Sequence, residues 1–255
     1  MIKPSTRSFL NVKDLRHPII ERIQTASEYV PNDIMLGEEN FNGMLLYGCN
    51  AVGKSSLMKA VGLNVIMAQA GMYVAASHFE YQPFDYLFTR ISDNDNLFKG
   101  QSSFAVEMSE LRSILKRSQE RSIILGDELC SGTESVSAQA IFAASVIKLS
   151  ERKVNFIFAT HLHELYKMDK IQELDNVKSF HLKGTFDEVS KALIYDRKLV
   201  EGNGPTIYGL EVCKAMDLDP DFLQLANHLR KNIIELDDKI MDDKKSQYHP
   251  DLIMD

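Results

Sequence analysis

Short apolar runs and amphipathic segments follow one another along most of this chain. The runs have the length and composition of buried strands, and the segments between them carry apolar residues three or four positions apart, as one helix face does. This alternation predicts an α/β fold with a mostly parallel sheet. The expected strands are 8–15, 44–47, 81–91, 122–128 and 155–160, and the expected helices are 57–70, 104–115 and 136–149.

The pattern changes after these elements. Residues 177–186 and 191–200 read as two strands joined by a short charged turn, which predicts a β-hairpin. The Gly-Asn-Gly-Pro segment 202–205 then breaks the regular structure, and a short helix is expected over 208–216.

A longer helix is expected from Asp219 and Pro220, which suit an N-cap and a first helical position. One apolar seam runs along it through Phe222, Leu225, Leu229, Ile233, Leu236 and Ile240. Such a seam packs against another helix, which can belong to the same chain or to a second subunit. The polar residues 242–255 are expected to form a loose tail.

The clearest chemical signal lies between the strand 44–47 and the helix that follows it. Residues 48–55 fit the pattern G-x-x-x-x-G-K-[ST], with a strand before and a helix start after, as this phosphate-binding loop requires. Gly48 and Gly53 let backbone N–H groups turn toward one phosphate. Lys54 is predicted to reach the β- and γ-phosphates, and Ser55 to ligate Mg²⁺. The loop therefore predicts a nucleoside-triphosphate site.

Two further groups follow buried strands and should reach the same sheet edge. Asp127 and Glu128 end one apolar run, and His161 follows another. Two acids at this place are costly to bury unless a cation lies near, and the phosphate loop supplies a place for one. Asp127 is therefore predicted to hold Mg²⁺, Glu128 to deprotonate the attacking water, and His161 to sense the γ-phosphate.

Composition narrows the choice of partners and compartment. The net charge of −7 argues against this chain supplying the main binding surface for DNA or for an anionic membrane. Cys49, Cys130 and Cys213 are odd in number and show no C-x-x-C spacing, which predicts a reducing, intracellular compartment without disulfides or a zinc site. No apolar run has the length of a membrane span, and no signal-like apolar core opens the chain.

Two residues keep alternative readings at this point. Tyr29, upstream of the loop, is either a platform for an adenine ring or a half-buried surface aromatic. Ser102 is either an N-cap of the helix 104–115 or a residue with a functional role.

Several segments together resemble the MutS family, the ABC-like ATPases of DNA mismatch recognition. They occur in the family's order and spacing, and the resemblance covers nearly the whole chain to about residue 240. The segments are 16–18, 29–33, 48–56, 85–90, 97–108, 123–133, 158–161, Glu164-Leu165 and 208–210. Cys130 and the Gly-Thr-Glu that follows it are similar to a divergent subgroup from giant viruses and octocoral mitochondria.

The resemblance implies roles for particular residues. Tyr29 corresponds to the aromatic that stacks on adenine, and His161 to the family's histidine after the last strand. Ser102 corresponds to the serine that reaches, in trans, the γ-phosphate held by the other subunit. The implied nucleotide-binding set is Tyr29, Gly48, Asn50, Gly53, Lys54, Ser55, Ser56 and Ser102.

The sequence also departs from the family's pattern. Ser131 stands where most members have Arg, so a charge near the composite site is missing. Ser103 replaces a usual Thr, and Val52 replaces a usual Gly in the loop. The N-terminal mismatch-reading domains of the family are not in this sequence, so we expect a piece of a longer chain.

The residue patterns and the resemblance together predict a P-loop ATPase of ABC-like type. We expect a mostly parallel sheet, a β-hairpin and a C-terminal helical dimerisation appendage. We expect an ATPase domain over 1–202, a helix-turn-helix appendage over 203–245 and a tail over 246–255. ATP and Mg²⁺ would lie between two subunits of a homodimer or of a heterodimer of related chains, while domains outside this sequence would contact mismatched DNA.

Two other functions are consistent with parts of the sequence. The first is a nucleotide-dependent dimerisation switch with little turnover, which the missing arginine at Ser131 motivates. The second is the ATPase head of another ABC-type protein of chromosome maintenance. A transporter is disfavoured, because no LSGGQ-like string and no membrane segment is present.

Overall fold

The computed structural model describes residues 7–23, 28–48, 52–91, 103–130, 132–187, 192–204 and 209–247. The chain forms two compact units, each described below by itself. The larger unit comprises residues 1–185 and 195–206, and the smaller unit comprises residues 186–194 and 207–255. In the described part of the chain, no helix combines the length with the apolar character needed to cross a membrane.

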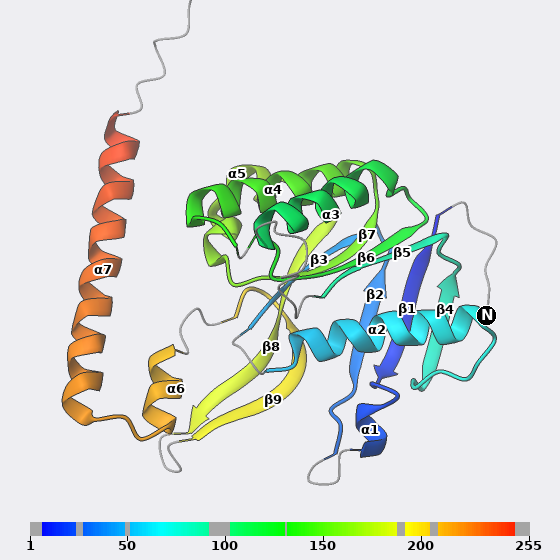
Figure 1. Ribbon diagram of the computed structural model, residues 1–255, viewed down its shortest axis with the longest axis horizontal. Coiled ribbons are helices and arrows are strands. Elements are labelled where there is room, and N and C mark those ends of the chain that lie inside the picture. Colours follow the sequence, from blue (N-terminus) through cyan, green and yellow to red (C-terminus); the bar gives the residue numbers. More distant parts are fainter. Residues whose placement is uncertain are drawn as a thin grey trace, which may run out of the picture. The chain divides into compact units, whose positions relative to one another are not determined.

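A six-stranded sheet forms the centre of the larger unit, in the order β5-β6-β7-β3-β8-β9 (Figure 1). The pairs β5–β6, β6–β7, β7–β3 and β3–β8 are all parallel. The strands are β3 (Gly43–Tyr47), β5 (Tyr86–Arg90), β6 (Ser122–Asp127), β7 (Asn155–Ala159), β8 (Val177–Asp187) and β9 (Ala192–Glu201). The order and direction confirm the expectation of an α/β fold with a mostly parallel sheet.

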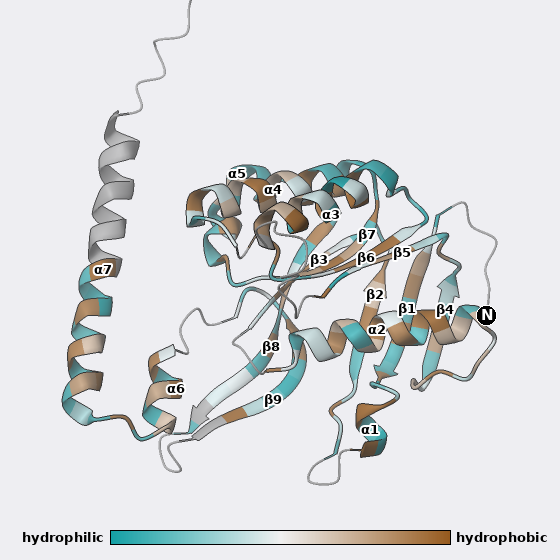
Figure 2. Cartoon of the chain, viewed as in Figure 1, coloured by the Kyte–Doolittle hydropathy of each residue, from teal (hydrophilic) through white to brown (hydrophobic). Residues whose placement is uncertain are grey.

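Both faces of this sheet are covered, which explains why its central strands are apolar throughout. Figures 1 and 2 show α3 (Ser103–Arg117), α4 (Ser135–Glu151) and α5 (Asp169–Gln172) on one face and α2 (Lys54–Gln69) on the other. Successive residues of β3 alternate between two cores: Leu46 packs in the core that contains α2, and Leu45 packs in the core that contains α4. Strand β3, which leads into the phosphate loop, is thus packed on both sides.

A second, three-stranded antiparallel sheet has the order β2-β1-β4. It consists of β1 (Phe9–Leu15), β2 (Asn32–Leu36) and β4 (His78–Gln82), and its apolar residues share a core with α2. Asn155 of β7, which is fully buried, joins the two sheets. Its Nδ2 donates to the carbonyl of Ser8 (2.8 Å), and its Oδ1 accepts from Nδ2 of Asn42 (3.1 Å).

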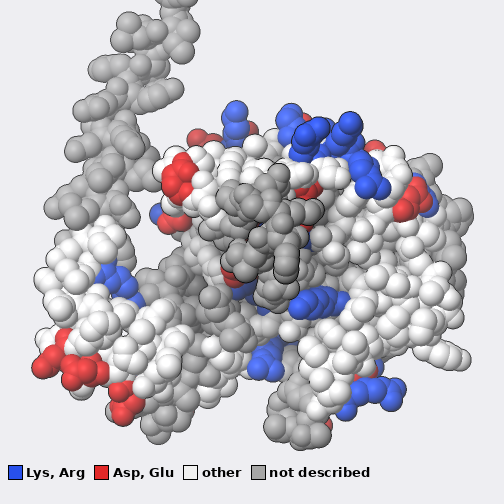
Figure 3. Space-filling model, viewed as in Figure 1, with Lys and Arg blue, Asp and Glu red and all other residues white. Residues whose placement is uncertain are grey.

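The helices α3 and α4 carry charged side chains on their outer surface. Figure 3 shows Lys and Arg gathered along the part of that surface formed by these helices, with acidic side chains among them. Arg117 of α3 lies over the rings of Tyr86 and Phe88 on the edge strand β5, at 5.6 and 5.7 Å from their centroids. This contact covers part of an otherwise exposed aromatic pair.

The smaller unit contains α6 (Gly209–Ala215) and α7 (Pro220–Gln247), which contact one another. Arg230 of α7 lies 3.7 Å from the carboxylate of Glu211 on α6. The carboxylate of Asp219 caps α7 by accepting from the N–H groups of residues 221 and 222, as the sequence predicted. The first four residues of the expected apolar seam are exposed, namely Phe222, Leu225, Leu229 and Ile233.

Some local predictions were wrong or incomplete. The single strand expected over 81–91 is two strands of different sheets, β4 and β5, because the chain turns at Pro83 and Phe84. Proline lacks the N–H that a continuous strand needs there. A strand at 32–36 was not predicted, and three short helices were not predicted either. These are α1 (Ile20–Ile23), the 3₁₀ helix η2 (His163–Lys167) and α5.

Candidate nucleotide site

Three neighbouring parallel strands deliver the candidate side chains to one sheet edge. Leu46 of β3 and Asp127 of β6 both pair with Ala159, near the carboxyl end of β7. The chain then continues into Gly48 after β3, Glu128 after β6 and His161 after β7. In open α/β sheets, ligands bind outside the carboxyl ends of the strands, so this edge is the expected position for a site.

The phosphate loop has the backbone conformation that its glycines permit. Gly48 and Gly53 have φ of +146° and +114°, which side-chain-bearing residues rarely adopt. Helix α2 begins at Lys54, whose Nζ donates to the carbonyl of Gly48 (2.6 Å). Val52 is fully buried and packs in the core with α2. The predicted loop residue Asn50 lies outside the described residues.

Ser55 and Asp127 form the part of the site that suits a metal. The hydroxyl of Ser55 donates to Oδ2 of Asp127 across 72 residues of sequence. The other carboxylate oxygen, Oδ1, is buried and has no partner among the residues that the structure describes. A buried, unpaired carboxylate oxygen is unfavourable, and a hard divalent cation with oxygen ligands would satisfy it. The two side chains therefore fit Mg²⁺.

The side chain of His161 lies close to both Lys54 and Glu128. Its Nε2 lies 2.8 Å from Oε1 of Glu128 and 3.3 Å from Nζ of Lys54. One ring nitrogen cannot donate to the carboxylate and accept from the ammonium at once, so the proton on Nε2 decides which contact is a hydrogen bond. The side chains of His161 and Glu128 are 38% and 42% exposed, so a ligand at the sheet edge can reach both.

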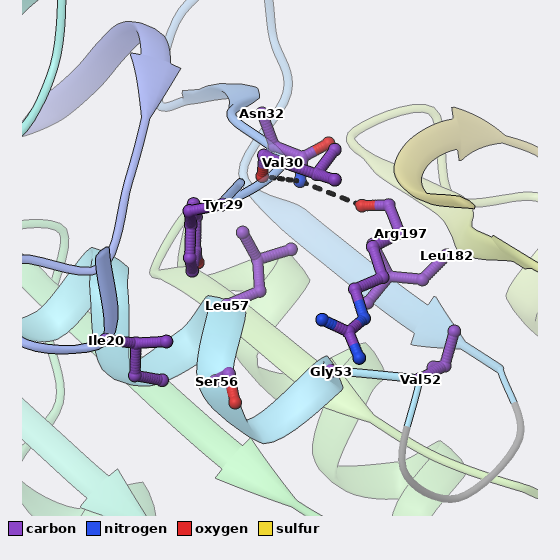
Figure 4. A pocket seen from close by; sticks show the side chains of 10 residues that line it. All are labelled: Ile20, Tyr29, Val30, Asn32, Val52, Gly53, Ser56, Leu57, Leu182 and Arg197. Atoms are coloured by element: carbon purple, nitrogen blue, oxygen red, sulfur yellow. Dashed lines mark hydrogen bonds between the residues drawn. The ribbon is translucent and has the colours of Figure 1, made fainter. Parts of the chain in front are cut away.

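The side chain of Tyr29 lines a hollow next to the phosphate loop (Figure 4). The hollow is partly open to solvent, and its empty space of about 540 Å³ includes part of that solvent. Its walls are Ile20, Tyr29, Val30, Asn32, Val52, Gly53, Ser56, Leu57, Leu182 and Arg197. Burial raises the pKa of the Tyr29 hydroxyl, which is therefore neutral at physiological pH. Tyr29 is half-buried, and its use as a platform for an adenine ring stays a prediction.

Arg197 of β9 is a wall residue that the sequence analysis missed. Figure 4 shows its guanidinium directed into the hollow, toward Gly53 and Ser56. Its backbone is left-handed (φ +57°), and its carbonyl accepts from Nδ2 of Asn32 (3.0 Å). Arg197 lies 168 residues after Tyr29 in a strand-like stretch, and no local pattern indicated that it would face the loop.

Three sequence-based assignments lie outside the described residues. These are the loop residue Asn50, Ser102 with its predicted role in trans, and Ser131, which replaces the usual arginine. Helix α3 begins at Ser103, immediately after Ser102. His163, two residues after His161, begins η2 and stacks on the ring of Tyr47 with centroids 5.1 Å apart.

Comparison with known proteins gives one consistent result. Residues 44–234 match the family described as MutS domain V. A putative DNA mismatch repair protein, a mutS homolog of Acanthamoeba polyphaga mimivirus, is 38% identical over 98% of this chain and 25% of its own length. The mitochondrial mutS homolog of Sarcophyton glaucum is 42% identical over 89% of this chain and 22% of its own length.

A bacterial protein is also similar to this chain. The MutS protein of Finegoldia magna is 35% identical over 94% of this chain and 28% of its own length. The chain spans about a quarter of the length of the curated relatives it matches.

Proposed function

The chain belongs to the MutS family of DNA mismatch repair proteins, and from that premise we propose that it is the ATP-hydrolysing module of such a protein. The observation that carries the proposal is the meeting of five side chains at one sheet edge. Lys54, Ser55, Asp127, Glu128 and His161 come from three strand ends and contact one another in two groups. Each is a residue type that phosphoryl transfer to water uses.

The triphosphate would lie along the loop between Gly48 and the start of α2. Backbone N–H groups of the loop and the positive end of the α2 dipole favour an anion there. Lys54 would exchange its bond to the carbonyl of Gly48 for the β- and γ-phosphates. Ser55 and Asp127 would hold Mg²⁺, which screens the negative charge of the transferred phosphoryl group.

Glu128 would accept the proton of the attacking water. It is exposed enough to contact water at the sheet edge, and its only hydrogen-bond partner among the side chains of the described residues is His161. His161, with a proton on Nε2, would hold the Glu128 carboxylate in place and then donate to the γ-phosphate. Lys54, 3.3 Å away, adds positive charge at the same point.

The hollow of Figure 4 would hold the base and ribose. The ring of Tyr29 offers a flat apolar surface for adenine, and the guanidinium of Arg197 offers a planar cation on the other side of the hollow. Leu57 and Val30 supply apolar contact between them. Ser56 connects this hollow to the phosphate loop, since it lies one residue after Ser55.

We further propose that two such modules bind ATP between them. Ser102, at the start of α3, would reach the nucleotide of the other subunit, and the exposed α7 residues would join the subunits. The partner is a second copy or a related chain, and mismatched DNA is contacted by domains of the longer protein. The mismatch repair names of the relatives support this role.

Replacement of Glu128 by Gln tests the assignment of the base. The amide cannot accept the proton, so turnover should fall by at least about 100-fold while Mg²⁺–ATP binding is kept. The measurements are steady-state phosphate release and binding of ATP by calorimetry. Glu151→Gln, at an exposed ion pair with Lys148, is the control and should change neither. Unchanged turnover in Glu128→Gln would show that Glu128 is not the catalytic base.

A nucleotide-dependent switch with little turnover is the second candidate. The observation in its favour is Ser131, which stands where most members of the family have Arg. Phosphate release that stays near the background of the Glu128→Gln variant, together with ATP-dependent self-association, would favour the switch.

A further inference from the structure

The backbone that follows Asp127 is bent in an unusual way. Glu128 and Cys130 both have left-handed conformations, with φ of +49° and +68°. Residues other than glycine adopt this region rarely, and they keep it only when the surrounding structure holds them there. The bend matters because it turns Glu128 out of strand β6 and toward His161.

Two hydrogen bonds donated by backbone N–H groups hold the bend at its two ends. The N–H of Glu128 donates to the carbonyl of Ala159 (3.0 Å) and so extends the β6–β7 pairing by one residue. The N–H of Cys130 donates to Oε1 of Glu107 (2.7 Å), a residue of α3 that is 23 positions away in sequence. Between them, the side chain of Leu129 is buried.

Glu107 is unlike Glu110, the other acid of α3. It is 3% exposed, whereas Glu110, on the same helix, is exposed and pairs with Arg90. A carboxylate is seldom buried without a specific partner, and its bond to a backbone N–H is stronger than that of a neutral acceptor. Cys130 is also buried, so water does not compete for this bond.

We propose that Glu107 is a positioning residue for hydrolysis, which fixes the left-handed bend so that Glu128 faces the γ-phosphate position. This inference rests on the proposed function, because it concerns the same reaction. Glu107 touches neither the nucleotide position nor Glu128 and acts through the N–H of Cys130. It also ties α3, the helix that starts at Ser103, to the bend that carries the base.

Two substitutions of similar size separate the hydrogen bond from packing. E107Q keeps an acceptor oxygen of the same reach, and E107M fills the same buried space without one. We expect E107M to lower kcat at least about tenfold while the affinity for Mg²⁺–ATP changes less than about threefold. E107Q should keep at least about half of the wild-type kcat. E110Q, on the exposed face of the same helix, is the control.

Labelling of Cys130 gives a second readout that does not depend on turnover. Its thiol is buried, and burial raises its pKa to about 11, so it should react slowly with iodoacetamide. If Glu107 holds the bend, E107M should increase the rate of Cys130 alkylation at least about tenfold, as mapped by mass spectrometry of its peptide. E107Q should leave the rate near that of wild type.

The outcomes are distinguishable. Equal kcat in E107M and wild type, or an equal loss in E107Q and E107M, overturns the positioning role. If E107M does not fold, as judged by thermal unfolding, E107A takes its place against E107Q with the same two readouts. If the wild-type protein releases no phosphate in any assembly, the proposed function fails, and with it the role in hydrolysis. The labelling rates still decide whether Glu107 holds the bend.

Discussion

Single side chains in this structure act through partners that are distant in sequence. Arg197 is the clearest case at the nucleotide hollow, because only folding brings it opposite Tyr29. His17 acts instead through near neighbours. Its Nδ1 accepts from the N–H groups of Ile19 and Ile20 (3.2 Å each), at the start of the short helix α1, whose first residue Ile20 lines the same hollow.

Arg197 can be tested by its removal. Arg197→Met keeps an apolar side chain of similar length and removes the planar cation, so the affinity for ATP should fall about tenfold. The value of kcat at saturating ATP should change little, because Arg197 lies at the hollow and not at the sheet edge where Glu128 stands. Fluorescent-nucleotide titration measures the affinity, and Arg112→Met, an exposed arginine of α3, is the control. An unchanged Kd for ATP would show that Arg197 does not contribute to ATP binding.

His17 predicts a loss of stability in mild acid. Burial, and then the nearby charge of Lys59, lower the pKa of His17, and burial also lowers the pKa of His163. Because the pKa of each histidine is lower in the folded chain than in the unfolded chain, the unfolded chain binds more protons as the pH falls. The free energy of unfolding should therefore decrease as the pH falls from about 7 toward 5.

An asparagine at position 17 provides the matched test. His17→Asn keeps a side-chain acceptor for the two N–H groups and has no titration in this range. Urea unfolding at pH 7.5 and 5.5 should show a smaller difference for the variant than for wild type. An equal difference would mean that His17 does not contribute.

The predictability of these residues depends on how local their signals are. Gly48, Lys54 and Ser55 were predicted because their motif lies within eight consecutive residues. Glu107 and Arg197 could not be predicted in this way. Glu107 bonds to a residue 23 positions away, and Arg197 lines a hollow together with Tyr29, 168 positions before it. A left-handed conformation at Glu128 or Arg197 also leaves no mark in the sequence, since neither residue is a glycine.

At the scale of elements, the candidate nucleotide site takes its residues from the segments of two sheets. Asn32 begins β2 of the antiparallel sheet and Tyr29 lies three residues before it, whereas the phosphate loop follows β3 of the parallel sheet. Asn155 lies fully buried where the sheets meet and bonds to groups of both flanking segments.

Replacement of Asn155 should loosen this junction. Asn155→Leu has similar size and leaves the carbonyl of Ser8 and the amide of Asn42 without this partner, so we expect a loss of about 3 kcal/mol in the free energy of unfolding. Denaturant titration by circular dichroism measures it. Asn11→Ala, at a partly exposed bond to Glu38, should lose less than about 1 kcal/mol. Similar losses in the two variants would show that Asn155 has no special role.

The elements themselves were predicted where apolar periodicity is strong. Strands β3, β6 and β7 are short and buried on both faces, and their apolar runs could be recognised without any knowledge of neighbours. The antiparallel sheet was not recognised, because β2 is a five-residue strand next to Pro31 and β4 was merged with β5. Which strands share a sheet is a long-range property, and periodicity does not contain it.

At the scale of the whole molecule, the exposed apolar residues of α7 set an expectation for assembly. Phe222, Leu225, Leu229 and Ile233 are each between 50% and 59% exposed and repeat at helical spacing, an arrangement that favours contact with another helix. The residues of α7 that face α6 are different ones, among them Arg230. The apolar row of α7 and its contact with α6 therefore involve different residues.

Charge on this face should prevent self-association. The double substitution Leu225→Glu with Leu229→Glu should weaken dimerisation by at least about 100-fold in Kd. Lys231→Glu, an exposed position off the seam, should leave it within about threefold. Sedimentation velocity over a concentration series measures both variants against wild type. Equal self-association of the double variant would place the subunit contact elsewhere.

The hollow between Tyr29 and Arg197 has a mechanical consequence. Residues of the antiparallel sheet, of α2 and of β9 line it. A small molecule bound there would contact all three parts of the larger unit at once. Loading with nucleotide should accordingly slow amide hydrogen exchange in β2, a strand that no phosphate would touch.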